Sequence, residues 1–144
     1  IEARYDIEIE EYVHILQIEG RTLGDIARNH VIPTAVKYQN ILIDNVKGLK
    51  EIYGKDFKKY ASEQLVLIAD ISQRIEAINS GVTTMTNSRK KANSIKDTTK
   101  KATIYCNQVK PLFDDIRYHC DKLELLIDDE LWPLAKYREL LFTK

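Results

Sequence analysis

Apolar residues recur along most of the chain in steps of three and four, the spacing that places side chains on one face of an α-helix. The first such run begins near Ile9, is interrupted by Pro33 and ends at Gly54. A proline inside a helix removes one backbone bond and clashes with the carbonyl four residues back, so we expect one long helix that bends near Asn29. Its inward positions are predicted to be Ile9, Val13, Leu16, Gly20, Leu23, Ala27, His30 and Thr34, then Ala35, Tyr38, Leu42, Val46 and Leu49.

Two further runs show the same spacing. The second extends from about Ala61 to residue 90, with inward positions at Leu65, Ile68, Ile71, Ile75, Ile78, Val82 and Met85. The third has inward positions at Cys106, Val109, Phe113, Ile116, Cys120, Leu123 and Ile127. The stretch between these two runs lacks apolar periodicity and is rich in serine, threonine and asparagine, which compete with the helix backbone, so a turn is predicted around residues 86–98.

The fold class that these runs predict is all-α. Spacing close to 3.5 residues is typical of helices that pack side by side at a shallow angle, so the expected architecture is an antiparallel bundle of three long helices, the first kinked near Pro33. A chain of 144 residues can bury about two-thirds of its unfolded surface, and one domain over residues 1–144 is expected. The tail beyond Asp129 is rich in leucine and aromatic residues, so we expect it to pack on the bundle or on a neighbour.

Composition narrows the class of protein. Apolar residues make up 44% of the chain and charged residues 31%, which suits long helices with one buried face. Lys and Arg number 22 and so do Asp and Glu, so no net charge favours nucleic acid or an anionic membrane as a partner. The start is acidic, where a signal peptide needs basic and then apolar residues, so the chain is predicted to be cytoplasmic. Because it begins at Ile1 and not at methionine, we expect a fragment of a longer polypeptide.

Three histidines and two cysteines are the candidates for chemistry, and each has a structural interpretation that we favour. Glu11 and His14 match half of the Glu-x-x-His motif of di-metal helical bundles, but that site needs the motif twice. His119 and Cys120 are adjacent, and neighbours on a helix point about 100° apart, so they cannot share a proton. His30 falls on the apolar face and is interpreted as a buried core histidine. The alternative interpretation makes His30 and Asn29 ligands that are exposed at the bend.

The remaining signals concern helix contact and charge. Gly20 and Gly24 have the spacing that allows close approach of a neighbouring helix. Basic residues gather between Arg89 and Lys101, and acidic residues between Asp114 and Glu130. Such segregation is interpreted first as solvated helix faces and second as a guide for subunit contacts. We therefore predict no catalytic, cofactor-binding or metal-binding residue in this chain.

Two long segments resemble a known family. They are RYDIEIEEYVHILQIEGRTLGDIARNHVIPTAVKYQN, residues 4–40, and VKPLFDDIRYHCDKLELLIDDELWPLAKYRELLF, residues 109–142. Both are similar to the C-terminal helical region of type III glutamine synthetases, the large bacterial form. The resemblance is closest at the two ends of the chain and weakest through the middle helix and the basic turn.

This resemblance implies a function for a larger parent protein. The parent would be an ATP-dependent ligase that joins ammonia to glutamate, uses Mg²⁺ or Mn²⁺ and assembles into stacked hexameric rings. Its nucleotide, glutamate and metal sites would belong to a preceding catalytic domain, so none is carried over to residues of this chain. The partners implied are that catalytic domain and neighbouring subunits of a homo-oligomer. A freestanding helical protein–protein interaction module, binding through the apolar tail around Trp132 and Phe142, is the alternative hypothesis.

Overall fold

The computed structural model of the chain describes residues 2–132, and every regular element within them is helical. The all-α prediction is confirmed. The elements in chain order are α1 (Glu2–Ile26), the π-helical turn η1 (Ala27–Val31), α2 (Ile32–Tyr53), the 3₁₀ turn η2 (Gly54–Asp56), α3 (Phe57–Asn93), α4 (Thr98–Ile104), the π-helical turn η3 (Tyr105–Val109) and α5 (Lys110–Leu126).

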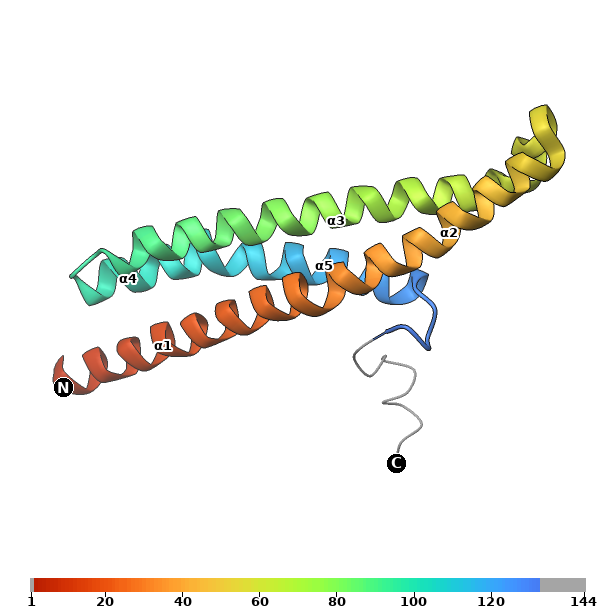
Figure 1. Cartoon of the computed structure of the whole chain (residues 1–144). Coiled ribbons are helices and arrows are strands. Elements are labelled where there is room, and N and C mark those ends of the chain that lie inside the picture. Colours follow the sequence, from red (N-terminus) through yellow and green to blue (C-terminus); the bar gives the residue numbers. More distant parts are fainter. Residues whose placement is uncertain (1, 133–144) are drawn as a thin grey trace.

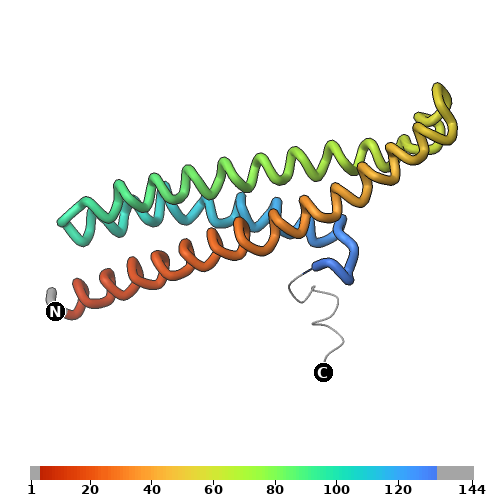
Figure 2. Tube along the Cα trace, in the orientation of Figure 1, coloured from red at the N-terminus to blue at the C-terminus, as the bar shows by residue number. Residues whose placement is uncertain are grey.

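The molecule is elongated, as Figure 1 shows. The longest helix, α3, packs against α2 over one part of its length and against α5 over another. The Cα trace in Figure 2 places the N-terminus at one end of the molecule and the turn between α2 and α3 at the other. That turn extends past the end of α5, so the last part of the molecule consists of α2 and α3 alone among the described residues.

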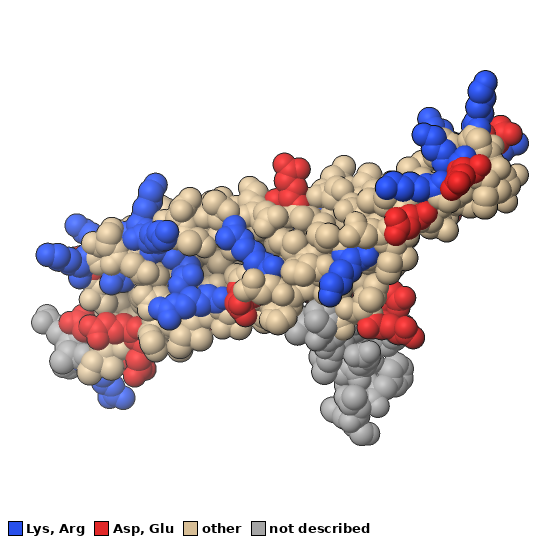
Figure 3. Space-filling model, viewed as in Figure 1, with Lys and Arg blue, Asp and Glu red and all other residues tan. Residues whose placement is uncertain are grey.

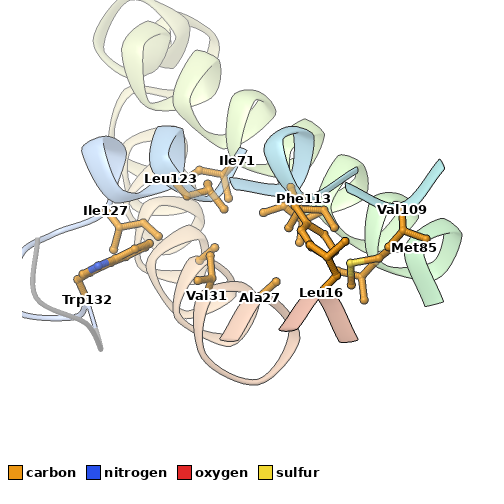
Figure 4. Packing of buried hydrophobic residues seen from close by; sticks show 14 of the residues in the cluster. Leu16, Ala27, Val31, Ile71, Met85, Val109, Phe113, Leu123, Ile127 and Trp132 are labelled. Carbon is orange, nitrogen blue, oxygen red and sulfur yellow. The ribbon is translucent and has the colours of Figure 1, made fainter. Parts of the chain in front are cut away.

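One apolar core connects the helices, and most of its residues lie on the faces that the sequence spacing predicts. Figure 4 shows Leu16 of α1, Met85 of α3 and Phe113 of α5 pointing toward one another. The largest side chains that are fully buried are Tyr105, Phe113, Ile71, Ile78, Met85, Ile116 and Leu123. Burial of this apolar surface is the main force that holds the helices together.

Both π-helical turns lie just before a proline. Val31 ends η1 two residues before Pro33, and Val109 ends η3 two residues before Pro111. Proline cannot donate to the carbonyl four residues back and its ring clashes with that carbonyl. In a π-helical turn each backbone hydrogen bond spans five residues and not four, so the turn contains one more residue than a turn of α-helix. The backbone hydrogen bonds before the proline are therefore rearranged. Pro33 was expected to bend the helix near Asn29, and Asn29 is the central residue of η1.

Because each π-helical turn contains an extra residue, two residues that were predicted to lie in the core are exposed. After Ala27 the next buried position is Val31, so His30, which was expected in the core, has half of its side-chain surface exposed (50%). In the same way the turn η3 buries Tyr105 and Val109 and leaves Cys106 exposed, although Cys106 was expected in the core. Leu65, also predicted to face inward, is exposed on α3.

The turn between the second and third runs is shorter than predicted. Helix α3 continues through the serine- and threonine-rich stretch to Asn93, beyond the expected end near residue 90. Packing outweighs weak propensity here, because Met85 and Ala92 are buried and the Asn93 side chain accepts hydrogen bonds from Gln17 and Tyr105. The chain then reverses over residues 94–97, inside the predicted range of 86–98.

The reversal between α2 and α3 follows the sequence closely. Gly54 has a φ of 58°, in the region that residues with a Cβ rarely adopt, and α2 ends at Tyr53. The rings of Tyr53 and Tyr60 stack across this turn with their centroids 4.1 Å apart. The predicted stop at Gly54 is confirmed, and the two helices that it joins pack against each other.

The chain beyond α5 packs on the helices as far as it is described. Trp132 is 9% exposed and belongs to the core, where Figure 4 shows it beside Ile127 and Val31. The tail residues Leu134, Tyr137, Leu140, Leu141 and Phe142, which were also expected to dock, lie outside the described residues. In residues 2–132, none of the helices has both the length and the apolar character needed to cross a membrane.

Candidate functional site

Glu11 and His14 both lie on the exposed face of α1. His14 borders a surface hollow whose other lining residues are Glu10, Val13, Gln17, Lys96, Thr98 and Lys101. Two lysines at such a hollow disfavour a bound cation by charge repulsion. Over the whole described range, residues 2–132, no group of three or more His, Cys, Asp or Glu side chains is placed to hold a metal ion.

His119 lies at the contact between α5 and α3, where its partner is an arginine and not a cysteine. Its Nδ1 is 3.1 Å from Nη1 of Arg74 on α3. Because an arginine only donates, this bond requires an unprotonated Nδ1, and the ring proton then lies on Nε2, which is 3.8 Å from Oδ1 of Asp115. Cys120 takes no part in this contact, so the two neighbours do not form a catalytic Cys–His pair.

Arg74 is the centre of a polar cluster that the sequence analysis missed. Its Nε donates to Oδ1 of Asp70 at 3.2 Å, and its guanidinium lies over the ring of Tyr118, 5.4 Å from the centroid. Tyr118 in turn meets His119 edge to face. The cluster joins residues 45 positions apart, Arg74 and His119, and no local motif indicates such a pairing. It fixes the position of α5 along α3.

The two cysteines lie in different environments. Cys106 is exposed, whereas Cys120 is partly buried. Burial, and to a smaller extent the charge of Asp121, raises the pKa of the Cys120 thiol from 9.0 to about 11. Only the thiolate form of a cysteine reacts with disulfide reagents. Because the Cys120 thiol stays protonated and is partly buried, Cys120 is poorly suited to act as a nucleophile.

We expect a thiol titration to resolve the two cysteines. At pH 8 an aromatic disulfide reagent should modify Cys106 rapidly and Cys120 about 100-fold more slowly, because a pKa of about 11 leaves far less thiolate. Addition of guanidinium chloride should make the two rates equal, which is the control for intrinsic reactivity. Two equally fast thiols in the folded protein would contradict the burial of Cys120.

The absence of a side chain at Gly20 leaves space for two neighbouring side chains, Arg89 of α3 and Phe113 of the core. A Cβ added at Gly20 would lie 3.0 Å from Cδ of Arg89 and 3.4 Å from Cε1 of Phe113. At Gly24 the nearest atom would be Cε of Met85 at 3.5 Å, which is ordinary contact. The space at Gly20 is thus taken up by the side chains of Arg89 and Phe113, and the predicted close approach of a helix at these glycines stays a prediction.

The charged segments are distributed over the surface as Figure 3 shows. Basic residues between Arg89 and Lys101 cover the end of α3 and the start of α4, where the side chain of Asp97 accepts a hydrogen bond from the backbone of Lys100 and caps α4. In the described part of the chain, Lys96 and Lys101 of this segment line the same hollow as Glu10 and His14, and neither cysteine is among its lining residues. The geometry supports helix packing and surface contact, not bond-making chemistry.

Comparison with known proteins identifies the family. Residues 1–50 match the family described as "Glutamine synthetase C-terminal domain". A glutamine synthetase of Bacteroides fragilis (strain YCH46) is 46% identical over 143 residues, which cover 99% of this chain and 20% of that protein. A type-3 glutamine synthetase of Dictyostelium discoideum is 24% identical over 147 residues, covering 100% of this chain and 20% of that protein.

A third relative agrees with these two. A glutamine synthetase of Butyrivibrio fibrisolvens is 22% identical over 143 residues, covering 99% of this chain and 20% of its own length. The chain thus spans about a fifth of the length of the curated relatives that it matches. The resemblance noted in the sequence is confirmed: the chain belongs to the glutamine synthetase family, as its C-terminal domain.

Proposed function

We propose that this chain is the assembly domain of an ATP-dependent ligase that joins ammonia to glutamate, and that it has no active site of its own. The observation that carries the proposal is the similarity of the whole chain to about a fifth of a glutamine synthetase, 46% identical in one relative. In support, His119 takes part in the contact between α5 and α3, and the two cysteines lie in different environments.

The unit proposed for this role is one domain, an antiparallel bundle of three long helices. Its first helix comprises α1, η1 and α2 with a bend near Pro33, its second is α3, and its third comprises α4, η3 and α5. The contacts of α3 with both α2 and α5, and of α1 with α4, support this arrangement. A π-helical turn before each of Pro33 and Pro111 supports a bend in the first helix and also in the third.

Neither ATP nor a divalent metal fits the residues described here. Mg²⁺ and Mn²⁺ take carboxylate oxygens as ligands, and within residues 2–132 no group of three or more His, Cys, Asp or Glu side chains is placed to hold a metal ion. The turns of the described chain, at Gly54–Asp56, 94–97 and 128–131, contain no glycine-rich phosphate loop. We therefore derive no catalytic step in this chain, and assign ATP and metal to a preceding catalytic domain in the cytoplasm.

The face of α1 near the N-terminus suits contact with that catalytic domain. Ile7, Ile15 and Ile18 are large apolar residues that remain exposed on α1. Clustered apolar side chains on a surface mark interaction sites more often than solvated faces. A domain that precedes residue 1 would join the chain beside these three residues, so we propose that it covers them.

The polypeptide encoded by the whole reading frame around these 144 residues tests the proposal. We expect it to form glutamine from glutamate, ammonia and ATP, and to assemble into an oligomer. Removal of the bundle should lower the assembled fraction in analytical ultracentrifugation. A polypeptide that makes no glutamine would contradict the ligase assignment. Unchanged assembly after removal of the bundle would contradict the assembly role alone.

A further inference from the structure

A surface hollow between α1 and α3 is lined by three arginines. They are Arg21 of α1, Arg28 of η1 and Arg89 of α3. Among the described residues that line the hollow, Asp25 is the one acid, so three arginines against one aspartate give the lining a net charge of two positive. Positive charges held close together repel one another unless an anion lies between them. The lining therefore favours an anion with two negative charges.

Asp25 does not neutralise these arginines, because its carboxylate has partners elsewhere. Its Oδ1 accepts a hydrogen bond from Nδ2 of Asn29, and its Oδ2 lies 3.9 Å from Nε2 of His30. In the described part of the chain no arginine forms an ion pair with it. The hollow thus keeps its positive charge.

Arg89 lacks an acceptor of its own. Its side chain passes over Gly20, where an added Cβ would lie 3.0 Å from Cδ and 3.2 Å from Nε of the arginine. This Nε is buried, and no described residue accepts a hydrogen bond from it. A partly buried charge without a counter-charge costs free energy. Because Arg89 also lines the hollow, an anion bound there supplies the missing counter-charge.

Arg28 is held in position by α3. Its Nη2 donates to Oγ1 of Thr83 at 2.6 Å and to the backbone oxygen of Asn79 at 3.3 Å. An arginine has three donor nitrogens, so Nε and Nη1 remain for a ligand. A guanidinium that is already fixed loses less conformational entropy when it binds an anion than a freely moving one. The hollow therefore contains at least one donor group that is positioned before any ligand arrives.

We propose that this hollow binds inorganic phosphate through Arg21, Arg28 and Arg89. A phosphate dianion carries both of its charges on one group, and guanidinium groups donate to its oxygens in pairs. The hollow has a volume of about 310 Å³, at the lower limit of small-molecule pockets, which suits one phosphate better than a whole nucleotide. Bound phosphate links α1 and η1 to α3. The inference goes beyond the assembly role proposed above and does not depend on it.

Binding is tested by isothermal titration calorimetry of the 144-residue chain at pH 8, where phosphate is mostly a dianion, with ionic strength held constant by sodium chloride. We expect one site per chain and a dissociation constant of about 1 mM or lower. At ten times that concentration the melting temperature should rise by about 4 °C. Concentrated phosphate also stabilises proteins without binding, so the rise must saturate with the same dissociation constant.

Two variants separate the site from the fold. Arg89→Met keeps an unbranched apolar stem over Gly20 and removes the charge, so it should raise the dissociation constant at least ~10-fold without lowering the melting temperature of the phosphate-free chain. Arg21 is exposed, so Arg21→Gln should weaken binding and leave the helix content unchanged. Arg4→Ala is the matched control, because this arginine side chain is 88% exposed on α1 and lies outside the hollow. It should bind phosphate like the unsubstituted chain.

Hydrogen exchange gives a second readout, since bound phosphate links two helices. Amides of η1 and of α3 near Arg89 should exchange more slowly with phosphate present, and Arg89→Met should abolish this protection. ATP saturated with Mg²⁺ should have no such effect, because the phosphate oxygens of the nucleotide bind the metal.

Three results would overturn the proposal. Calorimetry could show no saturable binding of phosphate. Phosphate could bind equally well to Arg89→Met and Arg21→Gln, which would make it an adventitious ion only. Succinate could bind more tightly than phosphate, which would make a dicarboxylate the ligand. None of these measurements involves glutamine formation, so their failure leaves the ligase assignment to its own test.

Discussion

Replacement of Phe113 by alanine is expected to lower the free energy of unfolding by about 3–5 kcal/mol. Phe113 is 1% exposed and lies where α5 meets α1 and α3, with its ring 3.4 Å from the Cβ position of Gly20. Such a loss is a large share of the ~5–15 kcal/mol typical of a whole domain. Urea denaturation followed by circular dichroism at 222 nm measures it.

Tyr5→Ala is the matched control for Phe113→Ala, because Tyr5 is an aromatic residue on α1 that is exposed to solvent. Its removal should change the free energy of unfolding by less than about 0.5 kcal/mol. Equal effects of the two substitutions would show that Phe113 does not join the helices as described.

Replacement of Trp132 by alanine is expected to cost about 3 kcal/mol, the second largest loss. Trp132 belongs to the apolar core together with Ile127 and Val31, although it lies beyond the last helix. Its indole Nε1 is buried without a hydrogen-bond partner among the described residues. Trp132→Phe should therefore cost less than about 1.5 kcal/mol, because it keeps most of the apolar contact and removes the unpaired donor.

The same denaturation measurement distinguishes the two Trp132 variants. Trp132 is the one tryptophan of the sequence, so its fluorescence in the unsubstituted protein should also show the blue-shifted emission of a buried indole. If Trp132→Ala left the unfolding free energy unchanged, the segment after α5 would not be part of the core. That segment would then be free to bind a partner, as the sequence analysis left open.

Helix periodicity predicted most of the core but not its local register. Val13, Leu16, Ile71, Met85, Phe113 and Leu123 are buried as the spacing required. The errors at His30 and Cys106 come from one cause, since the π-helical turns η1 and η3 each add a residue to the turn. A proline two residues after each turn was the available signal, but a period of 3.6 residues has no place for the extra residue.

Contacts between residues that are far apart in the chain could not be predicted from the sequence. The pairing of Arg74 with His119 depends on the position of α5 along the axis of α3. The spacing of apolar residues is compatible with more than one such position. The extension of α3 to Asn93 depends similarly on Gln17 and Tyr105 from other helices. In contrast, Gly54 ended α2 as predicted, because a positive φ is a local property of the backbone that glycine alone adopts freely.

The most direct test of the central claim is an assay of the purified 144-residue chain with glutamate, ammonia, ATP and Mg²⁺ or Mn²⁺. The account predicts no glutamine, and a melting temperature that the nucleotide and the metal leave unchanged, because a ligand that does not bind the folded state cannot stabilise it. Glutamine formation by this chain alone, or a melting temperature that rises with the concentration of ATP and metal, would contradict the claim that the bundle serves assembly and carries no active site.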